Sequence, residues 1–260
     1  MRTIPAVAPR LPRTTNLNRH LPPMTALAWL RAGINDLRVQ PGLSLIYGLL
    51  VFLMSVCVVL GLFGFGLDYI LFPALAGFMV VGPILAVGLY EKSRRIAAGQ
   101  PVTLTHMLFV KTQSGGQILF VGVMLCGLML LWMRAAVIIY ALFFGLRPFP
   151  GLDHVTGMLF TTATGWAMLI VGGAIGGLFA AFAFAISVLS IPMLLNENLD
   201  ALTAMAMSMT RVWNNLPVML AWGTIVVGLW LISVLIGMLG LIVVFPLLGH
   251  ATWHVYKAIR

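Results

Sequence analysis

The chain has 260 residues, of which 61% are apolar and only 8% are charged. A soluble domain carries about 25% charged residues, so this chain has too little polar surface to cover its apolar residues in water. The composition therefore excludes a soluble protein and predicts an all-α, polytopic membrane protein. The 15 Lys and Arg residues and 6 Asp and Glu residues give a net charge of +9. Basic loops beside a membrane explain this excess without a nucleic-acid partner.

Residues 1–23 differ in composition from everything that follows. This segment holds five prolines among four arginines and has no long apolar run. That pattern excludes a secretory signal and favours disorder. We expect a basic, proline-rich cytoplasmic tail, followed by a single membrane domain over residues 24–260.

Six apolar runs follow the tail, each close to or longer than the roughly 20 residues that a bilayer-spanning helix needs. The predicted spans lie near Leu43–Gly64, Leu71–Tyr90, Gly116–Phe144, Trp166–Leu195, Leu216–Ile236 and Leu239–Tyr256. The third and fourth are long enough to tilt or to extend beyond the hydrocarbon. The fold prediction is a six-helix transmembrane domain in the lipid bilayer.

The basic residues predict the orientation of these spans. In a six-span arrangement all but two of them fall on one side, and only Arg134 and Arg147 remain for the membrane or the other side. Lys and Arg gather in cytoplasmic loops. Both termini are therefore expected in the cytoplasm.

An internal repeat divides the predicted spans into three helical hairpins. The segment Gln40–Gly48 resembles Asn215–Gly223, and Pro83, Pro192 and Pro246 each lie toward the cytoplasmic end of an even-numbered span. Each proline removes one backbone donor and frees a carbonyl about one turn earlier, which needs another partner in lipid. A packing kink and a vestibule lined by three carbonyls are both compatible with this pattern.

Two amphipathic segments precede the first and fifth spans. Their apolar stripes consist of Leu27, Leu30, Ile34 and Leu37 in residues 25–39, and of Leu199, Leu202, Ala206, Met209 and Trp213 in residues 199–213. Short, mixed helices beside a span fit the headgroup layer of the membrane. We expect interfacial helices, with a groove on a partner protein as the alternative.

Arg134 lies within the third apolar run. A charge at mid-bilayer costs at least about 3 kcal/mol and marks a functional candidate. However, Arg134 follows Gly116 by 18 residues, which is roughly 27 Å along a helix and reaches the outer headgroups. We expect Arg134 to act as an anchor at the headgroups or to form an ion pair with Asp68 or Asp153 on that side. Contact with a substrate or a subunit is the alternative.

His250 and His254 are spaced i, i+4, which places both rings on one helical face. The zinc motif His-Glu-x-x-His has a glutamate between the same two positions, and two nitrogens are too few for a closed zinc site. We expect hydrogen bonding near the membrane interface and no cofactor. A metal or haem site and a proton relay are the alternatives.

The fourth span carries two overlapping Gly-x-x-x-Gly pairs, formed by Gly172, Gly173, Gly176 and Gly177. Such pairs let helices approach closely, either within the chain or between membrane-protein subunits. The sequence contains no phosphate loop, nucleophile motif or intramembrane carboxylate pair. We therefore expect a protein that is not an enzyme.

Five stretches carry a family resemblance: Gly82–Glu91, Trp132–Ala136, Ser190–Leu194, Trp213–Trp222 and Pro246–His254. They resemble an uncharacterised bacterial family of predicted integral membrane proteins, the domain of unknown function numbered twenty-one eighty-nine. The resemblance implies a six-span protein of a bacterial inner membrane and carries over no activity. Some relatives bear the label of an oxidase subunit I, which needs six histidine ligands, whereas this chain has 5 histidines.

Two classes of function follow from these patterns. The first is a non-catalytic accessory or assembly component of a membrane complex, with a membrane-protein partner or a second copy of the chain. The second is a small transporter or channel. Haem or copper handling through His250 and His254 is a third hypothesis. The near absence of charged groups within the spans favours the first class, because transporters usually place such groups near the midplane.

Overall fold

The computed structural model describes residues 17–145 and 151–260, and every regular element in those residues is a helix. This confirms the expected all-α fold. The long or consecutive apolar helices are α2 (Pro41–Gly64), α3 (Leu71–Leu85), α4 (Val87–Ala97), α6 (Gly115–Phe144), α8 (Ala163–Ser187), α9 (Ser190–Asn196), α11 (Leu216–Leu235) and α12 (Leu241–Ile259). The shorter elements are α1 (Thr25–Arg38), η1 (Asp68–Ile70), α5 (Leu104–Leu108), α7 (Leu152–Thr161) and α10 (Ala201–Asn214). Most of the predicted tail, residues 1–16, lies outside the described residues.

Five helical stretches within the described residues are long and apolar enough to cross a membrane. They are Pro41–Gly64, Asp68–Ala97, Gly115–Phe144, Ala163–Asn196 and Leu216–Leu235. The sixth predicted span corresponds to α12, which is helical but is not among the five. Its second half carries His250, His254 and Lys257, which lower its mean hydropathy. The protein is thus a multi-helix membrane protein, and the count of six spans is not confirmed.

The second and fourth predicted spans are each divided into two helices. Turns at Ala86 and at Val188–Leu189 separate α3 from α4 and α8 from α9. Pro83 lies three residues before the first turn and Pro192 three residues after the second. Pro246, in contrast, lies inside the continuous helix α12.

Helices that are distant in sequence form the closest contacts. α12 packs against α1 and α2 more extensively than against its neighbour α11, and α3 packs mainly against α6. A Cβ built at Gly48 would lie within 2.8 Å of Pro246 Cγ, so the absent side chain lets α2 approach α12. The division into three separate hairpins is therefore not confirmed.

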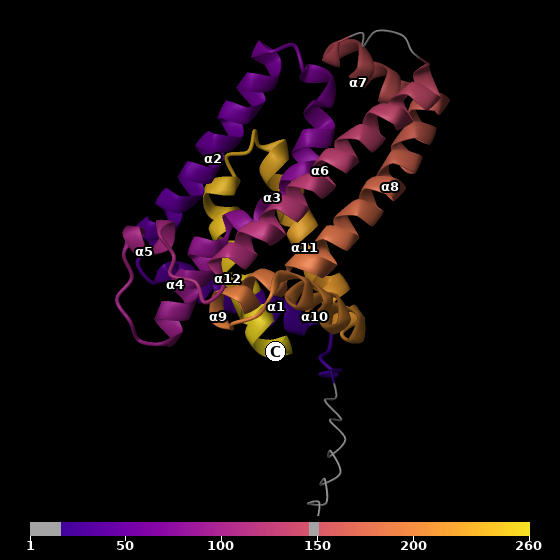
Figure 1. Cartoon of the computed structure of the whole chain (residues 1–260). Helices are drawn as coiled ribbons and strands as arrows, with labels where there is room; N and C mark the ends of the chain where they lie inside the picture. The colour runs from indigo at the N-terminus through magenta and orange to yellow at the C-terminus, as the bar shows by residue number, and fades with distance from the viewer. Residues whose placement is uncertain (1–16, 146–150) are drawn as a thin grey trace, which may run out of the picture.

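The described basic residues gather at one end of the bundle, with Arg134 as the exception. They belong to α1, α4, α10, the last turn of α12 and the adjoining segments, which lie near the C-terminus (Figure 1), whereas α7 lies at the opposite end. We call these the basic end and the far end. The segregation of charge expected from the sequence is present in the fold.

The two amphipathic helices α1 and α10 lie at the basic end (Figure 1), and each packs one face against the bundle. Ala26, Trp29, Gly33 and Asp36 of α1 are buried. Large members of the predicted stripes, such as Leu27, Leu202 and Trp213, remain exposed. Each helix therefore has one face on the protein and an adjacent apolar face turned away from it.

Candidate functional site

Polar side chains from four helices meet inside the basic end of the bundle. They are Asp36 on α1, Ser44 on α2, Lys92 and Ser93 on α4, and His250 and His254 on α12. All except His254 are buried. We call this group the polar cluster.

His250 is the centre of the polar cluster and is 0% exposed. Its Nε2 lies 2.9 Å from Ser44 Oγ, and its Nδ1 lies 2.8 Å from Ser93 Oγ. A neutral imidazole donates from one nitrogen and accepts at the other. Both ring nitrogens are thus occupied by hydroxyl groups of two different helices.

Lys92 reaches the same group from the other side of Ser44. The ammonium group donates to Ser44 Oγ at 2.7 Å and to the Gln40 carbonyl at 3.2 Å. The residue is 0% exposed, which is rare for a lysine. Gln40 has a left-handed backbone (φ 48°) just before α2, and its carbonyl also accepts from the Leu43 amide at 3.2 Å. Lys92 therefore ties the start of α2 to α4.

The remaining bonds assign a direction to the hydrogen-bonded chain. Ser93 donates to the Asp36 carboxylate, so Ser93 Oγ accepts from Nδ1–H of a neutral His250. Nε2 then accepts from the Ser44 hydroxyl, which itself accepts from Lys92. The result is a continuous chain from the Lys92 ammonium to the Asp36 carboxylate, with each hydroxyl donating once.

Asp36 closes the polar cluster at α1. Its Oδ2 lies 2.9 Å from His254 Nε2. Burial acts to raise the pKa of the Asp36 carboxyl, but hydrogen bonds from His254 and Ser93 outweigh it and lower the pKa below the usual 3.8. Gly33 brings this helix close, since a Cβ there would lie 2.8 Å from the Ala251 Cβ. Ionised Asp36 thus fixes α1 on α12.

A second group of polar contacts holds the chain ends together. The Tyr256 hydroxyl donates to Glu197 Oε1 at 2.6 Å, and Arg260 Nε lies 3.2 Å from the same oxygen. The side chain of Asn215 accepts from the Arg19 amide and donates to the Leu17 carbonyl, each at 2.9 Å. The N-terminal segment is therefore held against the start of α11, close to the C-terminus.

The structure separates the candidate residues named from the sequence. His250 and His254 belong to one cluster but bind different partners, which matches the expected hydrogen bonding. Arg134 is exposed on α6 and forms no ion pair or hydrogen bond with the described side chains, and Asp68 likewise forms no described ion pair. The side chain of Asp153, the other expected partner, lies outside the described residues, as does Arg147.

The three prolines do not line one vestibule. The carbonyl freed by Pro246 is that of Ile242, which lies against Gly48 of α2. Pro83 lies in the wall of a cavity between α3 and α11, whereas Pro192 is buried in α9 at the basic end and does not line that cavity. The packing interpretation fits Pro246, and the prediction of three convergent carbonyls is not supported.

Sequence reasoning missed several residues of the polar cluster. Lys92 lies beyond Tyr90, where the second predicted span ended, but the structure places it in helix α4 with its side chain fully buried. The one indication of this cluster in the sequence was a serine within an apolar run, such as Ser44, because a polar side chain in a span needs a hydrogen-bond partner. Nothing in the sequence connects Ser44 with His250, which lies 206 residues away.

The polar cluster has the chemistry of a structural tie between four helices. Each of its members contacts at least one other by a hydrogen bond, and no group of three or more His, Cys, Asp or Glu side chains that could hold a metal ion occurs within residues 17–145 and 151–260. For His250 to coordinate a metal ion or a haem, one of its ring nitrogens would have to give up its hydrogen bond to Ser44 or Ser93.

Comparison with known proteins gives one match. The family model described as "Predicted integral membrane protein (DUF2189)" matches residues 71–196, from the start of α3 to the end of α9. No curated protein and no solved structure matches the chain.

Proposed function

Residues 71–196 match the model of the DUF2189 family of predicted integral membrane proteins, and we propose that the protein is a non-catalytic component of a larger membrane complex. Its role is to bind another membrane protein through the far end of α6. The observation that carries this proposal is the length and exposure of that helix.

α6 is too long for the bilayer at an ordinary tilt. Its 30 residues extend about 45 Å, whereas the hydrocarbon is about 30 Å thick. Burying the whole helix in lipid requires a tilt of about 48°, beyond the usual range of roughly 0 to 40°. The start of α6 is anchored at the basic end, where Ser114 Oγ donates to the Glu197 carbonyl at 3.2 Å. The excess length therefore lies at the far end.

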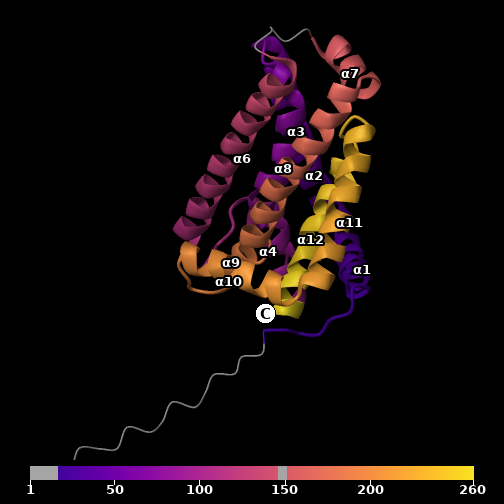
Figure 2. The same cartoon turned by 90° about the vertical axis from the view of Figure 1, so that its right-hand side faces the viewer.

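The excess part of α6 is apolar and exposed. Ile138 is 60% and Leu142 is 78% exposed. Figure 2 shows that α6 and α7 extend farther from the C-terminus than the turn between α11 and α12. An apolar helix end that protrudes from the hydrocarbon needs a cover, and a partner protein supplies one.

Arg134 lies one turn before this exposed segment and faces away from the bundle. A guanidinium at the lipid boundary is stabilised by headgroups or by a carboxylate of a neighbouring protein. A partner with an apolar face and an acidic residue at that depth fits the surface. We place the complex in a bacterial inner membrane, with the basic end and both termini in the cytoplasm.

The test is affinity purification of the tagged, full-length protein from its native membranes in mild detergent. A photoreactive amino acid at Ile138 is expected to cross-link to a defined membrane protein, and the same group at Leu119, near the basic end of α6, is expected to give none. Arg134→Gln should reduce recovery of that partner at least fivefold, whereas Lys111→Gln should not.

Equal cross-linking at both positions, or equal recovery with Arg134→Gln, would contradict the proposal. The same preparation also tests the third hypothesis. A visible haem spectrum or near-stoichiometric copper that disappears in His250→Ala would show that the polar cluster binds a cofactor.

A further inference from the structure

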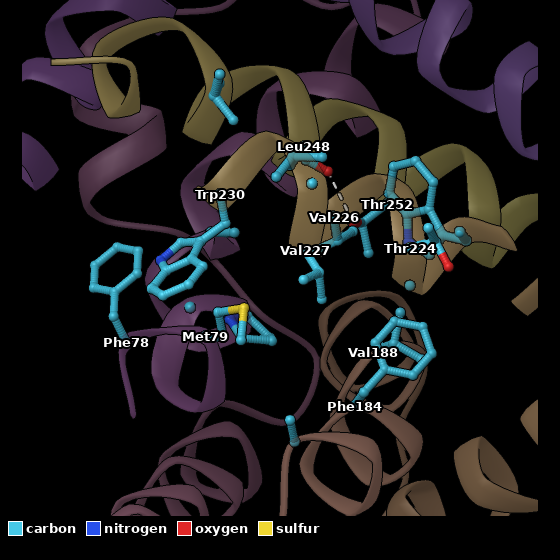
Figure 3. Close-up of a pocket in the computed structure, with 18 of the residues that line it drawn as sticks. Phe78, Met79, Phe184, Val188, Thr224, Val226, Val227, Trp230, Leu248 and Thr252 are labelled. Carbon is cyan, nitrogen blue, oxygen red and sulfur yellow. Dashed lines mark hydrogen bonds between the residues drawn. The ribbon is translucent and has the colours of Figure 1, made fainter. Parts of the chain in front are cut away.

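A cavity of about 620 Å³ lies within the membrane-spanning part of the bundle. One wall is formed by α3 and α8 and the other by α11 and α12. Figure 3 shows side chains from these walls facing one another across the space, including Phe78, Met79, Phe184, Val227 and Trp230. The lining is almost entirely apolar, and the volume lies within the usual range for ligand sites of about 300–1,000 Å³.

The cavity is as deep as one leaflet of a bilayer. Along α11 it extends from Met219 to Leu231, twelve residues farther from the basic end. That separation is about 18 Å, slightly more than half the hydrocarbon thickness. A ligand that fills it therefore occupies the depth of the leaflet at the basic end.

Hydrogen-bond donors occur at the basic end of the cavity. Trp222 is 0% exposed, and its indole N–H has no hydrogen-bond partner. The ring is held by an edge-to-face contact with Trp29 of α1, with centroids 6.3 Å apart. The side chain of Tyr90, which is 2% exposed, also lines the cavity. A buried donor without a partner is unusual and is satisfied by a ligand acceptor.

Glycines leave open space along both walls. A Cβ built at Gly82, Gly177, Gly223 or Gly228 would meet no atom within 4 Å, and all four line the cavity. The space beside them suits a flexible, unbranched hydrocarbon chain. A polar solute would leave most of its own groups without partners against these walls.

We propose that the cavity is a phospholipid site that takes one acyl chain from the leaflet at the basic end. The ester carbonyl of that chain accepts a hydrogen bond from Trp222 Nε1. The basic residues at the same end face the headgroup layer, where the phosphate of such a lipid lies. This site is independent of the α6 surface and of the partner proposed for it.

The test uses the full-length protein in phosphatidylcholine vesicles that contain a phosphatidylcholine with a diazirine in one acyl chain. After irradiation, cross-linked residues are mapped by mass spectrometry. Phe245 and Met219 line the cavity and are 7% and 1% exposed, so bulk lipid outside the bundle does not reach them. We expect cross-links at both residues in the wild type.

Two cavity-filling variants from opposite walls, Gly177→Leu and Gly223→Leu, should each reduce these cross-links at least fivefold. The matched control is Gly127→Leu on α6, which also has open space around it but does not line the cavity. If one filling variant does not fold, the variant from the other wall gives the same comparison.

Substitution of the donor tests the hydrogen bond separately. Trp222→Phe keeps an aromatic ring and should reduce cross-linking at Phe245 about fivefold at low lipid concentration, the factor expected for one hydrogen bond. Trp253→Phe is the control, because its N–H is also buried without a partner but does not line the cavity. No cross-link at Phe245 or Met219 in the wild type, or unchanged cross-links in the filling variants, would overturn the proposal.

Discussion

Replacement of Gly48 by alanine is expected to destabilise the contact between α2 and α12. A Cβ at this position would lie 2.8 Å from both the Ile242 carbonyl carbon and Pro246 Cγ, and closer still to the Ile242 oxygen. Neither a backbone carbonyl nor a proline ring can rotate away, so the two helices must separate. Overpacking of this kind costs about 1–3 kcal/mol.

The size of the effect can be measured as a melting temperature in detergent. At about 2–4 °C per kcal/mol for a chain of roughly this length, Gly48→Ala should lower the Tm by about 2–12 °C. Gly61→Ala, on the same helix but with no atom within 4 Å of a built Cβ, is the matched control. It should leave the Tm unchanged or raise it, because alanine favours a helix over glycine by about 0.5–1 kcal/mol. A Tm for Gly48→Ala at or above the wild-type value would refute the reasoning.

Three further outcomes follow from the polar contacts at the basic end. Lys92→Met removes the donor to Ser44 Oγ and one of the two donors to the Gln40 carbonyl, and it should cost roughly 1–3 kcal/mol in thermal unfolding. Lys257→Met at an exposed position should be neutral. The pKa of Asp36 is lowered from 3.8, so the stability that this carboxylate contributes is present above pH 3.8 and is lost as the pH falls below it. Asp36→Asn should lack this loss of stability in acid when melting temperatures are measured over a pH series. An identical pH profile for the variant and the wild type would contradict the prediction. Asn215→Ala removes the hydrogen bonds to Leu17 and Arg19 and should speed tryptic cleavage after Arg19. Asn214→Ala should not change the rate, because the side chain of Asn214 bonds to Thr210 within α10. Equal cleavage rates in the two variants would contradict the docking of the N-terminal segment on Asn215.

The helices themselves were largely predictable from the sequence. Uninterrupted apolar runs predict α2, α6 and α11 to within a few residues, because hydrophobicity and length alone decide a spanning helix. The turns that divide α3 from α4 and α8 from α9 were not predicted. Their residues, Ala86 and Val188–Leu189, are as apolar as the helices beside them, so hydropathy carries no mark of the break.

The interior of the basic end was not predictable in the same way. The hydrogen bonds expected of His250 were correct in kind, but their partners come from α2 and α4 and depend on tertiary packing. Lys92 follows an apolar run, and a lysine there is normally a loop residue. Its burial depends on Ser44 and on the irregular backbone at Gln40, which no local pattern reveals. The cavity likewise depends on tertiary packing, which leaves space between α11 and the helices α3 and α8.

The proposed function places the basic end in the cytoplasm, and the location of the two ends of α12 tests that placement most directly. A green fluorescent protein fused after Arg260 should fluoresce, and alkaline phosphatase inserted at Gly237, between α11 and α12, should be active outside the cytoplasm. That pair of results would establish α12 as a crossing helix and place the polar cluster on the cytoplasmic side. Phosphatase activity after Arg260, with none at Gly237, would contradict the orientation, and equal behaviour of both fusions would contradict the crossing of α12.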